Sequence, residues 1–321
     1  MRGVAVSAAA LAIALTVATA GVAHAQTHAP GSPGLGDPYF PRSGNGGYAV
    51  SHYDLALRYR PRSHRASATA AISATATQGL SRFDLDFRGP EITKLTVDGD
   101  RAGFSRSGQE LIVTPPSPID DGDEFAVDVA YRGELGPLTD PDSSLEGWTP
   151  TRDGAYVAGE PRGSPTWFPC NDYPTDKATF DFTLTVPKGR KAFANGILAE
   201  RIRGTKTTTF VWQMRDPMAT YLATATNGRF KLERSTIAGL PSYIAVDPLE
   251  ARASRKPLRR FPPMLGYFEP VFGSYPFDST GAIVDHAPRV GYALETQALP
   301  LFSTAPRPLP CPGSALSTSP G

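Results

Sequence analysis

The side chains best suited to metal or acid–base chemistry in this sequence are its five histidines. They are His24, His28, His52, His64 and His286. No two of them have the spacing of metal ligands on one helix face. His286 follows Asp285, but a single histidine beside a short strand is more often structural than catalytic, so it is assigned no role. The histidines alone therefore predict neither a metal site nor an acid–base pair.

Acidic side chains are the next candidates, and one stretch combines an acid with a rigid turn. The segment Gly159–Phe180 reads GEPRGSPTWFPCNDYPTDKATF and contains Glu160, a Pro–aromatic turn and the start of an apolar alternation. From the residues alone it is a structured loop with a surface glutamate. The stretch resembles the aminopeptidase N family of zinc metallopeptidases, in which a Gln or Glu precedes a segment like FPC-x-D-x-P-x-x-K-A-x-F. The matching positions are Phe168, Pro169, Cys170, Asp172, Pro174, Lys177, Ala178 and Phe180.

A second motif supports this resemblance near the end of the chain. Tyr292–Thr296, YALET, is similar to the Gly-x-Met-Glu-Asn exopeptidase motif of the same family, with Tyr292 in place of Gly and Thr296 in place of Asn. The glutamate of the motif is retained as Glu295.

The resemblance assigns roles to four of these residues. It implies that Glu160 and Glu295 bind the free amino group of a peptide substrate, and that the backbone of Ala293 and Leu294 lies beside that substrate. Two carboxylates suit this task because a peptide α-amino group titrates near about 8 and arrives largely as an ammonium. Paired anions offset the cost of holding that cation in a cleft.

Hydrolysis in this family requires a zinc ion held by a helical His-Glu-x-x-His and a further glutamate. No His-Glu dipeptide occurs in this sequence, and 26 of the 321 residues follow Glu295. The resemblance thus implies zinc in the complete family, no zinc bound by this chain, and no catalytic residue within it. We expect this chain to be a fragment that is cut short before the zinc helix. A shifted reading frame after about Ala305 is our hypothesis for the cause.

The first residues and the cysteines bear on the compartment. Arg2 precedes the apolar run Val4–Ala20, and Ala23–Ala25 is an Ala-x-Ala cleavage site, which predicts a signal peptide, cleavage after Ala25 and a secreted protein. A membrane anchor is the alternative reading of this run. Cys170 and Cys311 form no CxxC pair, which gives no support to redox or thiolate metal sites, and a disulfide between them is left open.

Composition and periodicity predict a mainly β protein. The sequence contains 32 Pro and 31 Gly, which favour short strands and turns, and 32 basic against 31 acidic side chains, which argues against nucleic acid as a partner. Apolar residues alternate around Tyr53–Tyr59, Phe83–Phe87 and Phe125–Tyr131, and again around Phe180–Val186 and Tyr243–Ala245. These patterns predict two packed antiparallel sheets.

The expected organisation has five parts. They are a signal peptide (1–25), a Gly/Pro-rich linker (26–47), a β-sandwich N-terminal domain (48–247), the start of a catalytic domain (248–305) and a disordered Pro/Ser-rich tail (306–321). The resemblance implies that the β-sandwich is saddle-like and that the later region is the truncated start of a thermolysin-like α/β domain. Within that region an apolar stripe, spaced 3 and 4 residues apart, predicts a proline-interrupted helix from Leu258 to Phe272, with the stripe used for packing.

The implied function is release of N-terminal amino acids from peptides by a secreted zinc aminopeptidase, with this chain as an inactive fragment. The expected partners are then peptide substrates. No association with a membrane is expected after signal cleavage, and the oligomeric state stays open. The alternative is a secreted, non-catalytic β-sandwich module in which Trp148, Trp167 and Tyr173 stack on a sugar or peptide. A retaining glycosidase with a carboxylate pair is a third possibility.

Overall fold

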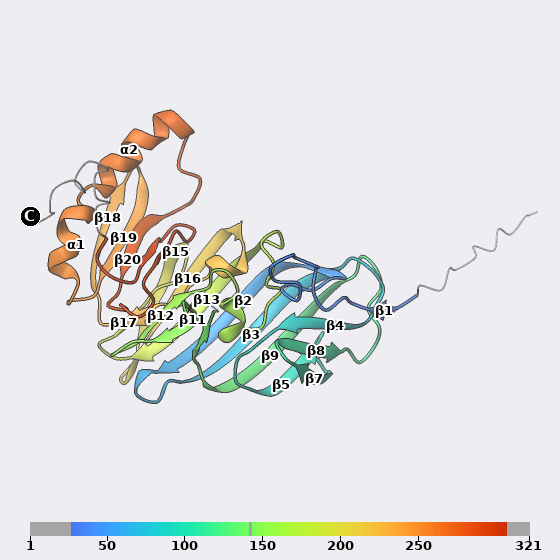
Figure 1. Ribbon diagram of the computed structural model, residues 1–321. Coiled ribbons are helices and arrows are strands. Elements are labelled where there is room, and N and C mark those ends of the chain that lie inside the picture. Colours follow the sequence, from blue (N-terminus) through green and yellow to red (C-terminus); the bar gives the residue numbers. More distant parts are fainter. Residues whose placement is uncertain (1–26, 141–142, 307–321) are drawn as a thin grey trace, which may run out of the picture.

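The computed structural model describes residues 27–140 and 143–306, and it is mainly β as the sequence predicts (Figure 1). The predicted signal peptide, Cys311 and the predicted tail after Pro306 lie outside the described residues.

The largest element is an eight-stranded sheet whose long strands cross the centre of Figure 1. Its order is β15 (Ile197–Arg203), β16 (Thr207–Met218), β13 (Ala178–Pro187), β2 (Tyr48–Arg60), β3 (Arg65–Ala76), β9 (Glu124–Glu134), β5 (Glu91–Val97) and β6 (Asp100–Arg101). Along β2 and β9 buried and exposed side chains alternate, which is the predicted period of two. Six of the pairings are antiparallel, but β13 runs parallel to β2. The expectation of purely antiparallel sheets is therefore wrong at this pair.

Two smaller sheets accompany the large one in the first part of the chain. One contains β1 (Ala29–Pro30), β4 (Leu80–Asp86), β8 (Glu110–Thr114) and β7 (Gly103–Ser107). The other contains β10 (Pro137–Thr139), β11 (Leu145–Pro150), β12 (Ala155–Ala158), β17 (Asn227–Gly228) and β14 (Lys191–Ala192). Aromatic side chains fill the core: Phe180 stacks on Tyr53 with ring centroids 4.9 Å apart and on Phe182 at 5.5 Å.

The described part of the predicted linker, residues 27–47, is packed against the sandwich, which corrects that expectation. Its strand β1 pairs in parallel with β4. Asn45 is buried, and its backbone amide donates to Asn171 Oδ1 at 2.6 Å. Gly44 has a φ of +70°, and a Cβ there would lie 2.6 Å from Tyr173 Cβ. The segment is held by backbone and amide hydrogen bonds, so an argument from apolar composition alone could not detect its packing.

A cluster of buried carboxyl groups lies beside this segment. Asp86 accepts hydrogen bonds from the backbone nitrogens of Gly44 and Asp172, at 3.1 and 2.9 Å, and from the side chain of Gln109 at 2.8 Å. Asp172 accepts one from the Thr220 hydroxyl at 2.6 Å. Both carboxyl oxygens of Glu110 are buried without a hydrogen-bond partner among the described residues. These acids are thus removed from water, and only some of their oxygens are compensated.

A separate five-stranded sheet forms the later part of the described chain. Its order is β18 (Lys231–Ile237), β19 (Leu240–Val246), β20 (Thr280–Val284), β22 (Leu301–Phe302) and β21 (Ala293–Leu294). The predicted boundary at residue 248 separates β18 and β19 from the sheet to which they belong. The sheet grouping puts the boundary before Lys231, because β19 pairs in parallel with β20.

Two helices connect β19 to β20, as a parallel pair requires (Figure 1). They are α1 (Ala251–Leu258) and α2 (Phe261–Phe272), and single 3-10 turns occur elsewhere at η1 (Pro61–Ser63), η2 (Ser164–Thr166) and η3 (Thr220–Leu222). The interruption expected from the prolines is present between the two helices. The packing expectation fails in part: Leu265 is buried, whereas Phe268 and Phe272 are 41% and 79% exposed.

Neither helix is long and apolar enough to cross a membrane, and the same is true of every helix in the described ranges.

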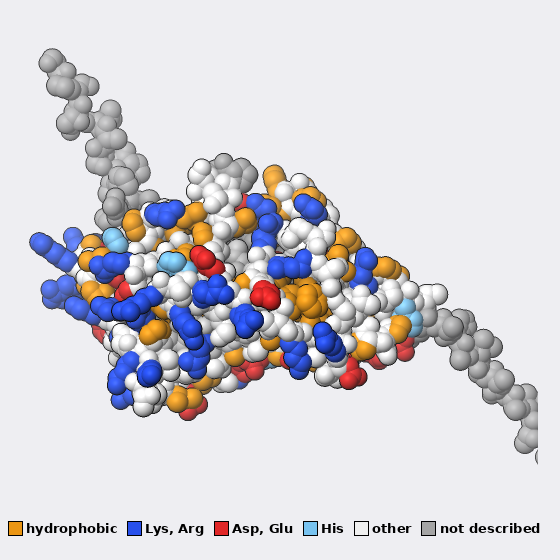
Figure 2. All heavy atoms as spheres, turned by 90° about the horizontal axis from the view of Figure 1, so that it is seen from below, with side chains coloured by type: hydrophobic (Ala, Val, Ile, Leu, Met, Phe, Trp, Pro, Cys, Tyr) orange, Lys and Arg blue, Asp and Glu red, His pale blue; other side chains and the backbone are white. Residues whose placement is uncertain are grey.

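Charge is distributed unevenly although the net charge is close to zero. Figure 2 shows Lys and Arg side chains gathered at one end of the molecule, on the face turned to the viewer. Helix α1 and the turn after it carry five exposed cations, Arg252, Arg255, Lys256, Arg259 and Arg260. The overall balance of charge therefore hides a locally basic surface.

Candidate functional site

Glu160 lies exposed at the start of the loop between β12 and η2, and its neighbours hold that loop firmly. The Ser164 hydroxyl donates to the Thr220 carbonyl at 2.8 Å, and the Arg162 amide donates to the buried Glu146 carboxylate at 2.9 Å. Gly159 approaches η3 so closely that a Cβ there would lie 2.7 Å from the Tyr221 carbonyl oxygen. A glycine is required at that position, and it fixes the backbone from which Glu160 projects.

Glu295 also lies exposed, in the tight loop between β21 and β22. The Thr296 amide donates to the Leu294 carbonyl at 2.9 Å, and the Thr296 hydroxyl donates to the Leu299 carbonyl at 2.6 Å. Thr296, which replaces the Asn of the resembled motif, thus closes the loop on itself. The side chain of Leu294 is buried and anchors the strand end, while Ala293 is exposed.

Strand β21, which contains Ala293 and Leu294, is the last strand of its sheet. It pairs antiparallel with β22 on one side, through Ala293 with Phe302 and Leu294 with Leu301. No described strand pairs with its other side. An edge of this kind offers backbone donors and acceptors to an extended peptide.

Tyrosines link the surroundings of the two glutamates electrostatically. Burial raises the pKa of Tyr292 to about 12, and the negative charges of Glu160 and Asp140 add to the effect. Burial likewise raises the pKa of Tyr156, with further contributions from Tyr292, Asp285 and Glu295.

The same influence reaches a third tyrosine, because burial and the charge of Glu160 raise the pKa of Tyr221. Glu160 and Glu295, which are distant in sequence, therefore both lie close enough to this group of tyrosines for their charges to raise a tyrosine pKa. Tyr292 stands out in the sequence only as a departure from a motif, and no motif marks Tyr156 or Tyr221. Tyr156 and Tyr221 are identified by their positions near the two glutamate loops in the fold. No local sequence pattern identifies them.

Tyr292 also ties the Glu295 strand to the sandwich. Its hydroxyl donates to the Leu145 carbonyl in β11 at 3.0 Å. A glycine, which the resembled motif has at this position, could not make that bond.

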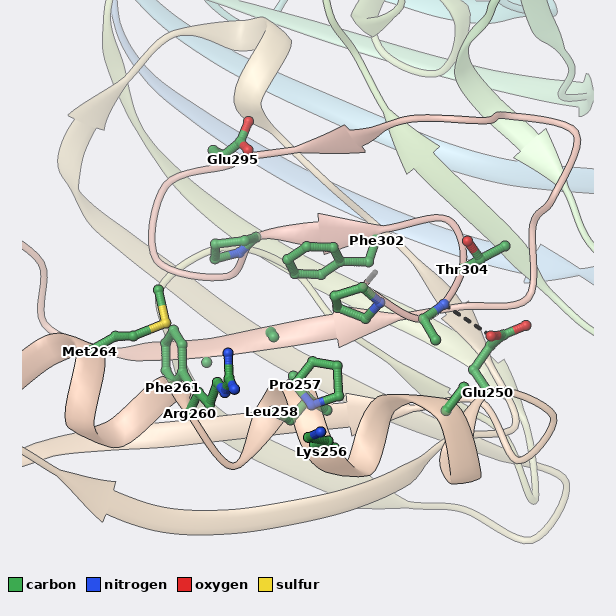
Figure 3. A pocket seen from close by; sticks show the side chains of 16 residues that line it. Glu250, Lys256, Pro257, Leu258, Arg260, Phe261, Met264, Glu295, Phe302 and Thr304 are labelled. Carbon is green, nitrogen blue, oxygen red and sulfur yellow. Dashed lines mark hydrogen bonds between the residues drawn. The ribbon is translucent and has the colours of Figure 1, made fainter. Parts of the chain in front are cut away.

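A cavity of about 780 Å³ lies beside Glu295, between the two helices and strands β20 and β22 (Figure 3). Its wall is largely apolar and includes Leu258, Phe261, Met264 and Phe302. In Figure 3 the Glu295 carboxylate points away from Phe302 and Met264. Glu295 nevertheless belongs to the residues that line this cavity.

Glu250 lies at the other end of this cavity, and its carboxylate has two hydrogen-bond partners. Its carboxylate oxygens lie 2.5 Å from His286 Nδ1 and accept the Ala305 amide at 2.9 Å. This pair joins the start of α1 to the segment just after β20.

The residues present do not fit a zinc ion. Within residues 27–140 and 143–306, no three His, Cys, Asp or Glu side chains are grouped so that they could hold a metal. Each described histidine ring has a side-chain hydrogen-bond partner: Asp120 for His28, Thr179 for His52, Tyr59 for His64 and Glu250 for His286.

The tryptophans named for a binding module are not available to a ligand. Trp148 and Trp167 are fully buried, and their rings pack against each other with centroids 6.1 Å apart. Tyr173 is partly buried. The expectation that Trp148 and Trp167 stack on a ligand is therefore wrong. Cys170 is buried and forms no disulfide with any described residue.

Comparison with known proteins shows which family the chain matches. Residues 49–222 match the family model of the peptidase M1 N-terminal domain. Glutamyl aminopeptidase of Rattus norvegicus is 26% identical over 245 residues, which cover 69% of this chain and 25% of that protein. Aminopeptidase B of Rattus norvegicus is 30% identical over 122 residues, covering 37% of this chain and 18% of that protein.

Solved structures are similar over most of the described chain. An M1 zinc metallopeptidase mutant of Deinococcus radiodurans bound to a Tyr-Ser-Ala substrate has a TM-score of 0.78 and 28% identity, covering 85% of this chain and 65% of its own. A two-domain M1 zinc metallopeptidase mutant bound to L-tryptophan has a TM-score of 0.77 and 27% identity, covering 84% of this chain and 64% of its own. The chain thus spans a quarter of the glutamyl aminopeptidase and slightly less than two thirds of these structures.

Proposed function

Because this chain belongs to the peptidase M1 family, we propose that it supplies the substrate-end recognition of an aminopeptidase, with Glu160 and Glu295 binding the free α-ammonium group of a peptide. The observation that carries the proposal is the placement of two exposed carboxylates on firmly held loops around one group of tyrosines. In the family, release of N-terminal residues would follow from such recognition. That activity is likewise part of the proposal.

The arrangement suits a peptide that enters with its amino end first. An ammonium placed between two carboxylates gains charge-assisted hydrogen bonds, which are about twice as strong as neutral ones. The free edge of β21 lies next to Glu295 and can pair with the substrate backbone through Ala293 and Leu294. Binding at both places would orient the first peptide bond in one direction.

Zinc would supply a Lewis acid and an activated water in a complete family member. Because the described residues do not fit that ion, the proposal assigns binding of the substrate end to this chain and no step of hydrolysis. By itself the chain is proposed to be inactive.

We also propose that the chain is exported, on the basis of its apolar N-terminal run and the Ala23–Ala25 cleavage site. Intact-mass measurement of secreted material is expected to give a polypeptide that begins at Gln26. A cell-associated product that retains Met1 would contradict this proposal.

Ligand binding tests the roles of the glutamates directly. The peptide Tyr-Ser-Ala is expected to bind the purified chain about tenfold more tightly than its N-acetylated form, since acetylation removes the cation. Glu295→Gln is expected to remove most of that preference, a loss of about tenfold. Glu160→Gln is expected to have a smaller effect, because the amide oxygen still accepts a hydrogen bond. Titration followed by NMR measures both affinities, including weak ones.

The matched control is Glu124→Gln, which neutralises an exposed glutamate on β9. It is expected to leave the preference unchanged. If Glu295→Gln keeps the preference for the free amino group within about twofold of the parent, the assignment of Glu295 is wrong.

A further inference from the structure

A buried amide, Asn195, connects the loops that carry the two glutamates. It lies in the turn between β14 and β15 and is completely buried. Its side-chain nitrogen donates to the Leu222 carbonyl at 3.0 Å and to the Gln297 carbonyl at 2.9 Å, while its oxygen accepts the Thr224 amide at 2.9 Å. The side-chain nitrogen of Asn195 thus donates two hydrogen bonds, and its side-chain oxygen accepts one.

The first of these bonds leads to Glu160. Leu222 ends η3, and the preceding residues of η3 contact the Glu160 loop through the bond from Ser164 to Thr220 and the close approach of Gly159 to Tyr221. The Asn195 amide therefore holds the surface against which the Glu160 loop rests.

The second bond leads to Glu295. Gln297 is two residues after Glu295 in the same tight loop, and its own side chain donates to the Asp216 carbonyl in β16 at 3.2 Å. Two hydrogen bonds at one residue thus tie the loop of the later sheet to the sandwich. A loop with one of its two ties removed would be free to shift relative to Glu160.

The turn that carries Asn195 is itself rigidly placed. Gly196 has a φ of +84°, and a Cβ there would lie 2.0 Å from the Gln213 carbonyl oxygen in β16. The Gly196 carbonyl accepts the Ser279 hydroxyl at 2.6 Å, just before β20. The amide is therefore presented from a backbone that cannot easily adapt.

We propose that Asn195 is a positioning residue that sets the separation of Glu160 and Glu295, so that both carboxylates can bind one ammonium group. This inference rests on the proposed function of the two glutamates. Asn195 is buried and touches no substrate, and it acts through the loops that its amide joins. Removing the amide is expected to leave the local conformation of each glutamate loop unchanged. The distance between the two carboxylates is then expected to vary more.

The test compares Asn195→Ala with a matched variant, Asn171→Ala. Asn171 is also buried and also makes three side-chain hydrogen bonds, two to Asn45 and one to Asp176, and none of them joins the Glu160 loop to the Glu295 loop. Both variants are expected to lower thermal stability. Only Asn195→Ala is expected to reduce the preference for Tyr-Ser-Ala over its N-acetylated form, from about tenfold to below about threefold.

A double substitution separates positioning from general destabilisation. If Asn195 sets the geometry, Glu295→Gln in the Asn195→Ala background is expected to cost less than about threefold, against about tenfold in the parent. Asn195→Ser, which keeps one donor and one acceptor, is expected to give an intermediate preference and serves if the alanine variant does not fold.

Two results would overturn the inference in distinguishable ways. If the parent prefers the free amino group and Asn195→Ala and Asn195→Ser retain that preference, Asn195 is only structural and the proposed function stands. If the parent itself shows no preference, the roles of both glutamates and of Asn195 are wrong together.

Discussion

Phe180→Ala is expected to lower the free energy of unfolding by about 3–5 kcal/mol, the usual cost of removing a large buried aromatic side chain. Phe180 lies in β13 at the parallel junction with β2, is fully buried, and contacts three other rings. The rings around it belong to Tyr53, Phe168 and Phe182, which are also fully buried and cannot collapse into the space without moving both strands. Urea unfolding followed by fluorescence and circular dichroism measures the change.

Phe104→Ala provides the comparison. Phe104 lies in β7, is 45% exposed, and is expected to contribute less than about 1 kcal/mol when truncated. A loss at Phe180 no larger than that at Phe104 would mean that the aromatic cluster is not a tightly packed core.

Raising the pH from 5 to 8 is expected to destabilise the fold, by up to about 4 kcal/mol for each carboxyl group that stays protonated in the folded state across this range. Burial raises the pKa of Asp172 to about 8 and of Glu110 to about 8, and the charge of Asp86 adds to both shifts. Burial also raises the pKa of Asp86 to about 6.

The direction follows from the protons bound in each state. In the unfolded chain these carboxyl groups titrate near about 4, so between that pH and about 8 the folded state binds more protons. Their stabilising contribution is complete below the unfolded pKa and is lost as the pH rises through the folded one. Each excess proton contributes a slope of about 1.4 kcal/mol per pH unit.

Glu110→Gln tests the assignment to a particular residue. Replacing this unpartnered buried carboxyl group with a neutral amide is expected to flatten the fall of unfolding free energy between pH 5 and 8, measured by urea unfolding at each pH. Glu124→Gln, at an exposed position, is expected to leave the slope unchanged. A parent protein whose stability rises across this range would rule out the proposed protonation of the cluster.

Local alternation was sufficient to predict the central strands. The buried positions of β2, β9, β13 and β16 follow the period of two, because each of these strands has one face against the core. The same reasoning could not reveal the parallel pairing of β13 with β2 or the membership of β18 and β19 in the later sheet. Those features depend on which distant strand supplies the neighbour, and alternation does not encode that choice.

The candidate site was predicted in a different way and to a different extent. Glu160 and Glu295 came from a family resemblance, and their placement around Tyr292 required the fold. No local pattern could indicate a role for Asn195, because its partners Leu222 and Gln297 lie 27 and 102 residues away. The pair of Glu250 and His286, 36 residues apart, escaped for the same reason.

The parallel junction between β2 and β13 also has a consequence for the order of folding. His52 and Thr179, whose side chains lie 2.7 Å apart across this junction, are separated by 127 residues. A contact of that sequence separation requires the closure of a long loop before it is rewarded, which slows folding. During synthesis β2 can first pair with β3, its neighbour in sequence, while the edge that will receive β13 stays open. The nascent chain therefore exposes an unpaired strand edge until β13 has been made, and this edge is open to association with other chains.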